Sequence, residues 1–305
     1  MKTFLILFLA FFGTLPASRA DSLCDFYRKS QPALYKLICA GGSTSSKPAG
    51  ASSTFNAAFN LSSASLPTEP SSYGLETLLH RIRGGDGKVS PTFSIVKGFQ
   101  KFGTGISTSS NVSFYGDDLP HRIVGPTLLR DFNPTEAEKG SLPNLNIGTS
   151  FALAEFQKGP TVRIGLSGRY NKTTDSWGGG PALLLNWSRL SLGSGFSRER
   201  VSNLLPQILF TTTSASVRVS ILEFEYIVLT DNVDLPLGPV QILTMTATVR
   251  RLLLTAAVRK LDYLQTGEET QWHFAAQYLF TDHLSAGFLY NYIPGANSVG
   301  IQYFL

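Results

Sequence analysis

Apolar and polar residues alternate with a period of two from about Tyr73 to the last residue. The pattern is clearest over 272–280, where every second residue is apolar, and it recurs over 161–170 and 243–250. Successive side chains of a β-strand point to opposite faces of the sheet, so this period predicts strands with one apolar and one polar face. The sequence therefore predicts an all-β region over 73–305.

The composition of the polar face distinguishes between two architectures that produce such alternation, a soluble sandwich or barrel and a transmembrane barrel. The polar positions hold mainly Gly, Ser, Thr, Asn and Gln, and only 15% of the chain is charged, against about 25% in ordinary globular proteins. Aromatic residues such as Trp272, Tyr290 and Tyr292 fall near strand ends, as in the aromatic girdles of membrane barrels. We therefore predict a transmembrane antiparallel up-and-down β-barrel with lipid outside and a polar lumen.

The connections between the predicted strands alternate between short and long, as in bacterial barrels with periplasmic turns and outer loops. The alternation of residues slips near Ser214–Leu222, which indicates either a turn or a bulge. The barrel is expected to have about 14 strands, with 12 as the alternative. Short links are predicted at Gln157–Pro160, Ser188-Arg189, Arg250-Arg251 and Thr281-Asp282, and longer ones at Gly116–Pro143, Asn171–Gly180, Arg198–Pro206, Asp231–Gly238, Leu261–Glu269 and Ile293–Asn297.

The N-terminus has the three parts of a secretory signal peptide. Lys2 gives a positive start, Phe4–Phe12 is an apolar run, and small residues at Ser18 and Ala20 form a cleavage site. The run is much shorter than the roughly 18–20 residues of a spanning helix. Residues 1–20 are therefore predicted to be a cleaved signal peptide, and the barrel is expected in the outer membrane of a Gram-negative cell.

Two segments separate this signal from the predicted barrel. Residues 21–40 show helical spacing of apolar residues and contain Cys24 and Cys39, the only cysteines of the chain. Since exported proteins meet an oxidising compartment, we expect a disulfide between them. Residues 41–72 are rich in Ser, Ala, Gly and Pro, and we interpret them as a linker or as a plug inside the lumen.

The candidate site consists of charged residues that the alternation turns toward the lumen. A buried charge needs a partner or water, so these residues indicate either interstrand ion pairs or a constriction that selects what passes. The predicted lumen-facing charges are Glu76, His80, Arg163, Arg169, Glu223, Glu225, Arg251 and Arg259.

Other chemistry finds little support in the sequence. His283 and Ser285 resemble the His-x-Ser pair of outer-membrane phospholipases, but parity turns both toward the lumen, beside a predicted inner turn. No catalytic residue, cofactor or metal is predicted, because the four His show no metal-ligand spacing and no phosphate-binding loop is present. The net charge of +5 is too weak to suggest nucleic acid as a partner.

The last residues resemble the C-terminal recognition signal of Gram-negative outer-membrane proteins. Val299, Ile301, Tyr303 and Leu305 alternate with small or polar residues, with Leu in place of the usual final Phe. This resemblance implies outer-membrane lipid and the barrel-assembly machinery as partners of the chain.

A second resemblance concerns the Phe55–Leu66 segment, FNAAFNLSSASL. It is similar to the N-terminal region of the long-chain fatty-acid transporter (FadL-type) family, in which an Asn-Pro-Ala segment lies inside a fourteen-stranded barrel. The chain has Asn60-Leu61 in place of Asn-Pro. We expect a monomer for passive passage of small or hydrophobic solutes; the alternative is a structural or surface-interaction barrel with a closed lumen.

Overall fold

The computed structural model describes residues 64, 73–82, 89–109, 144–155, 161–171, 175–186, 190–200, 207–231, 240–263, 267–281, 284–291 and 296–304. No helix within these ranges is long and apolar enough to cross a membrane. These ranges contain fourteen strands: β1 (Tyr73–Ile82), β2 (Val89–Phe99), β3 (Phe102–Ser109), β4 (Asn144–Glu155), β5 (Thr161–Asn171), β6 (Ser176–Asn186), β7 (Leu190–Glu199), β8 (Ile208–Val219), β9 (Leu222–Asp231), β10 (Val240–Val249), β11 (Leu252–Tyr263), β12 (Gly267–Leu279), β13 (Leu284–Asn291) and β14 (Ala296–Phe304).

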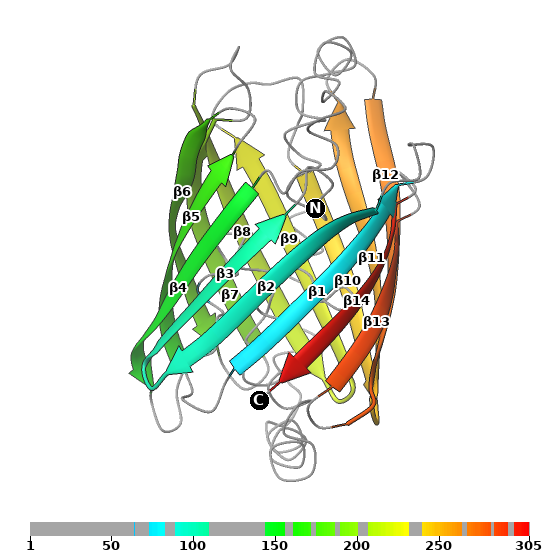
Figure 1. The fold of residues 1–305 in the computed structure, drawn as a ribbon. Coiled ribbons are helices and arrows are strands. Elements are labelled where there is room, and N and C mark those ends of the chain that lie inside the picture. The colour runs from blue at the N-terminus through cyan, green and yellow to red at the C-terminus, as the bar shows by residue number, and fades with distance from the viewer. Residues whose placement is uncertain are drawn as a thin grey trace.

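Every strand pairs antiparallel with its neighbours in sequence, so the predicted all-β, up-and-down arrangement is confirmed. The first and last strands also pair, from Gly74 with Phe304 to Ile82 with Ala296, and the sheet is a closed barrel of tilted strands (Figure 1). Strand lengths run from 8 to 13 residues, around the roughly 9–11 that a tilted strand needs to cross a bilayer.

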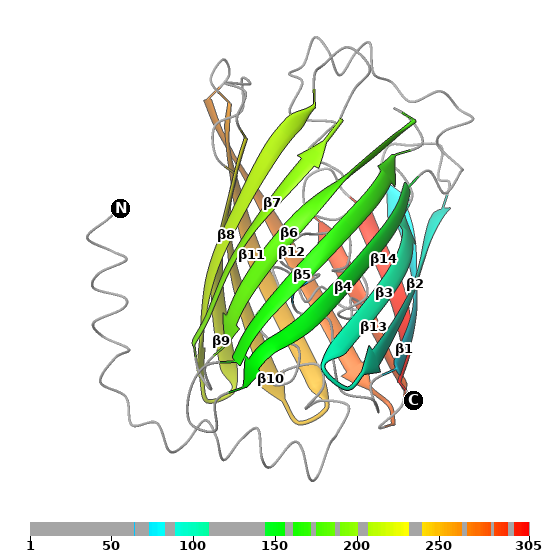
Figure 2. The same ribbon diagram turned by 90° about the vertical axis from the view of Figure 1, so that its left-hand side faces the viewer.

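The described two-residue turns lie at one end of the barrel, and the strand ends that flank the longer stretches 110–143 and 232–239 lie at the other (Figure 2). Three two-residue turns join β2 to β3, β8 to β9 and β10 to β11. The first residue of each turn has a left-handed backbone: Gln100 at φ 48, Ser220 at φ 57 and Arg250 at φ 55. The turn at Ser220 explains the slip in alternation near Ser214–Leu222, because a two-residue turn reverses the chain there.

Two predicted long loops are much shorter in the structure. Asn171–Gly180 is expected to be a loop, but β5 extends to Asn171 and β6 begins at Ser176. The Leu261–Glu269 connection is expected to be long, but β11 extends to Tyr263 and β12 begins at Gly267. Asp262 pairs with Glu268 in this extension. These polar residues, which the sequence predicted to lie in a loop, therefore continue the pairing of β11 with β12. The sheet also contains a bulge in β4 between Ala152 and Ala154, where the register with β5 shifts.

Side-chain exposure alternates over long stretches of several strands, such as β5 and β10, as the period of two predicts. On β5, Arg163 and Gly165 are buried whereas Ile164 and Leu166 are exposed at 38% and 57%. The buried positions face the inside of the barrel and the exposed ones face outward, since alternate residues of a strand lie on opposite faces. The barrel therefore presents most of its large apolar residues to the outside.

Strand β6 contains one glycine that its backbone requires. Gly179 has φ 132, and a Cβ at this position would collide with the backbone carbonyl of Ser167 on β5. Only glycine adopts such a conformation without strain, so Gly179 allows β5 and β6 to pair closely next to Pro181, which has no backbone N–H to donate.

Several expectations fall on residues that the structure does not describe. They are the signal peptide 1–20, the helical segment 21–40 with its Cys24–Cys39 disulfide, and most of 41–72.

Candidate functional site

The outer surface of the barrel is apolar. Its exposed side chains include Leu153 on β4 at 59%, Leu166 on β5 at 57% and Ile301 on β14 at 55% exposure. Val299, Ile301 and Tyr303 of the proposed C-terminal signal all belong to this surface. A soluble monomer rarely exposes a large continuous apolar surface, whereas a membrane barrel needs one facing lipid.

Aromatic residues gather near both ends of this apolar surface. Phe99 and Phe102 flank the short β2–β3 turn with ring centroids 5.6 Å apart, and Phe102 lies 5.2 Å from Phe151 on β4. At the opposite end, Tyr170 and Trp177 flank the β5–β6 connection, with centroids 5.4 Å apart. Aromatic residues at both ends are typical of the two interfaces of a membrane barrel.

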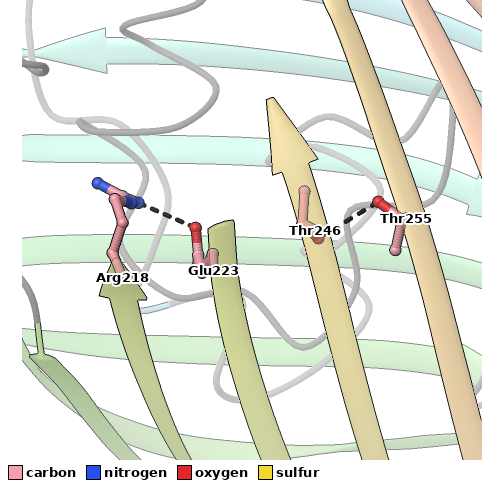
Figure 3. A network of polar contacts seen from close by, with 4 residues as sticks. All are labelled: Arg218, Glu223, Thr246 and Thr255. Atoms are coloured by element: carbon pink, nitrogen blue, oxygen red, sulfur yellow. Dashed lines mark hydrogen bonds and ion pairs between the residues drawn. The ribbon is translucent and has the colours of Figure 1, made fainter. Parts of the chain in front are cut away.

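The inner wall over β8–β11 carries a polar patch, which we define as Arg218, Glu223, Glu225, Thr244, Thr246 and Thr255. The register places four of these residues in one row, with Arg218 beside Glu223, Glu223 beside Thr246, and Thr246 beside Thr255. Figure 3 shows this row on the inside of the barrel.

Each half of the row is held by a direct contact. Arg218 Nη2 donates to Glu223 Oε2 at 3.0 Å, and the two side chains are 12% and 9% exposed. The hydroxyl oxygens of Thr246 and Thr255 are 3.3 Å apart, and either can donate to the other. Glu225 lies two residues beyond Glu223 on the same face and is also buried, at 4% exposure. The patch thus combines a salt-bridged charge pair, a second carboxylate and hydroxyl groups.

A second polar contact on the inner wall involves the residue that suggested esterase-like chemistry. Ser285 is fully buried, and its Oγ accepts a hydrogen bond from Gln277 Nε2 at 2.8 Å. Its sequence neighbour His283 lies outside the described residues. The described contact therefore ties β12 to β13, which is a structural role for the serine.

The eight predicted lumen charges are distributed as follows. Arg163, Glu223 and Glu225 are buried among the inward residues. Arg251 is different: it lies in the β10–β11 turn, where its Nη1 donates to the backbone carbonyl of Phe280 at 2.9 Å and so links two neighbouring turns. For the remaining four, the structure describes the backbone position and not the side chain: Glu76 and His80 on β1, Arg169 on β5 and Arg259 on β11.

Among the residues whose side chains the structure describes, Arg218 is an inward charge that the sequence analysis missed. It lies two residues before the β8–β9 turn, in the stretch where the alternation slips. A signal was available, because Arg218 and Glu223 are symmetric about the turn Ser220-Ile221 and a two-residue hairpin places such residues side by side. A two-residue turn at Ser220-Ile221 therefore predicts that Arg218 and Glu223 lie side by side on the same face of the sheet.

One residue of 41–72 is described, and it lies on the lumen side of the barrel. Ala64 is fully buried and packs with Ala182 and Leu184 of β6. These two residues alternate with the exposed Pro181 and Leu183, so they point inward. Ala64 therefore contacts the inner wall.

No group of three or more His, Cys, Asp and Glu suited to hold a metal ion occurs in the described part of the chain. On the described inner wall, the polar patch brings the greatest variety of polar groups together. Its carboxylates, guanidinium and hydroxyls can form hydrogen bonds with water or polar solutes.

Comparison with known proteins by sequence finds no matching family and no matching curated protein. Among solved structures, the fold is similar to a variant of the Rh. blastica porin, at 11% identity and TM-score 0.43, with 77% of this chain and 98% of the porin covered. The Acinetobacter baumannii outer membrane protein Omp33 gives 8% identity and TM-score 0.47 over 78% and 100%. A loop-deletion mutant of Vibrio cholerae OmpT, an outer membrane protein, gives 12% identity and TM-score 0.38 over 77% and 98%. None of these three is described as a fatty-acid transporter.

Proposed function

We propose that the chain is an outer-membrane β-barrel that allows small or hydrophobic solutes to pass passively through its lumen. The observation that carries this proposal is the polarity of the barrel: most large apolar side chains lie outside, whereas the buried charged and hydroxyl-bearing side chains lie inside, together with some apolar ones such as Ile227 and Ile242. Only a barrel surrounded by lipid gains from this arrangement, because the apolar surface leaves water and the polar groups keep hydrogen-bond partners.

The width of the barrel supports passage as the function. Fourteen strands enclose more space than inward side chains can fill, since about eight suffice for a filled interior. The polar patch offers hydrogen bonds to small polar solutes, whereas the resemblance of Phe55–Leu66 to fatty-acid transporters suggests hydrophobic ones. Both classes therefore belong in the test.

The burial of the inner wall favours a second candidate, a structural or surface-interaction barrel whose lumen is closed. Glu225, Gln277 and Ser285 are 4%, 1% and 0% exposed although they point inward. Little water reaches these groups in this conformation, so a barrel with these contacts fixed would pass little.

Solute flux separates the two candidates. We expect liposomes containing the full chain to swell in small sugars, and to do so at least several-fold faster with Ala64→Trp, because a Trp cannot fit the fully buried site against β6. Leu183→Trp, on the exposed outer face of the same strand, is the matched control and should behave like the unchanged chain.

If liposomes do not swell with the unchanged chain or with either variant, this result would instead support the structural or surface-interaction barrel with a closed lumen. Binding of a fluorescent fatty acid to the same proteins tests the hydrophobic class. Binding that weakens with Ala64→Trp and not with Leu183→Trp would place the acyl chain in the lumen.

A further inference from the structure

The inner face of β2–β7 contains an unbroken row of very small residues. Following the register from strand to strand, Gly98 pairs with Gly103, Gly103 with Ser150, Ser150 with Gly165, Gly165 with Ala182, and Ala182 with Gly195. Directly paired residues share one face of a sheet. These six residues, which we call the small-residue row, therefore form a strip around almost half of the inner wall in which Ser150 is the only polar side chain.

Every member of the small-residue row is buried, with Ser150 at 0% and Ala182 at 4% exposure. Such residues cannot bury one another, because neighbouring strands are about 4.8 Å apart and a glycine has no side chain to cover the next backbone. In an open lumen their backbone would face water. Their burial therefore requires other atoms of the chain against this strip.

Ala64 is a described residue that supplies such atoms. It is fully buried against Ala182, a member of the row, and Leu184, two residues further along β6. Ala64 is also small, so two backbones can approach closely here, as glycine-rich strand positions allow. Around Ala64 the sequence reads NLSSASL (60–66), with hydroxyl and amide groups that can hydrogen-bond in a polar lumen.

We propose that the small-residue row is the docking face for residues 41–72 of the same chain, seated through Ala64 on β6. Glycine, serine and alanine at these six positions leave room for a polypeptide that larger side chains would exclude. The adjoining part of the wall, over β8–β11, carries the bulkier polar patch instead. The proposal concerns what occupies the lumen and does not depend on whether solutes pass.

Crosslinking tests this docking directly. In the full chain carrying Cys24→Ser and Cys39→Ser, the pair Ala64→Cys/Ala182→Cys should be joined by a short thiol crosslinker in intact outer membranes. Tryptic digestion and mass spectrometry would identify the linked peptides. The matched control is Ala64→Cys/Leu183→Cys, because Leu183 is adjacent in sequence but 41% exposed on the outer face. We expect at least ten-fold more crosslink with position 182 than with position 183.

A second variant tests the row rather than the single contact. Gly165→Leu would place a bulky side chain in the middle of the row, next to Ala182, and should reduce the 64–182 crosslink several-fold. Ile164→Leu changes the neighbouring outward residue and should leave it intact. Equal crosslinking at 182 and 183, or no crosslink at all in a folded barrel, would overturn the proposal, as would a crosslink indifferent to Gly165→Leu. Since none of these readouts measures flux, failure here leaves the swelling test of the unchanged chain unaffected and removes only the reason to expect faster swelling with Ala64→Trp.

Discussion

Replacing Leu166 by Arg is expected to destabilise the barrel by about 2–4 kcal/mol, the cost of a charged side chain on the lipid face near the bilayer midplane. Leu166 lies in the middle of β5, five residues from each end, and is exposed on the outer face. Unfolding in urea from lipid vesicles measures the free energy, and the folded fraction on unheated gels gives a simpler estimate.

The control for this substitution is Ile221→Arg. Ile221 is a branched aliphatic residue exposed at 43%, but it lies in the short β8–β9 turn at the end of the barrel. A charge at the interface costs only about 0–1 kcal/mol. Equal destabilisation by the two changes would mean that the outer face is not in lipid.

Removing Arg218 should be the most damaging single change on the inner wall. Arg218→Met leaves the buried carboxylate of Glu223 without its 3.0 Å partner, and Glu225 adds a second negative charge on the same face. Breaking a largely buried pair by removing one partner costs on the order of 3–5 kcal/mol. Urea unfolding of the variant near neutral pH would measure this loss.

The double variant Arg218→Met/Glu223→Met isolates the pair. It removes both charges and keeps side chains of similar length, so it should be clearly more stable than Arg218→Met alone. A double variant whose loss equals the sum of the two single losses would show that the ion pair contributes nothing to the stability of the barrel.

The strands and their faces could be predicted because the barrel has a simple local rule. Alternate residues of each strand face lipid and lumen. A few residues around Ile164 or Trp272 are therefore enough to predict which side chains point outward. The short turn at Arg250-Arg251 could be located for the same reason, since these residues interrupt the alternation for only two positions. The turn at Gln100-Lys101 was not predicted.

Contacts between strands could not be predicted in this way, because they depend on register. Ala182 lies beside Gly165 and Gly195 only because the turns and the bulge in β4 fix how each strand is displaced along the next. Arg218 was missed because the alternation slips just after it. The length of β11 was underestimated because Asp262 and Glu268 look like loop residues until they are paired.

The location of the folded chain tests the central claim most directly. After separation of the cell envelope on a density gradient, the protein is expected in the outer-membrane fraction, and its gel mobility should differ between unheated and heated samples because a folded barrel resists detergent. Recovery in the soluble periplasmic fraction, with the same mobility before and after heating, would contradict an apolar surface that faces lipid.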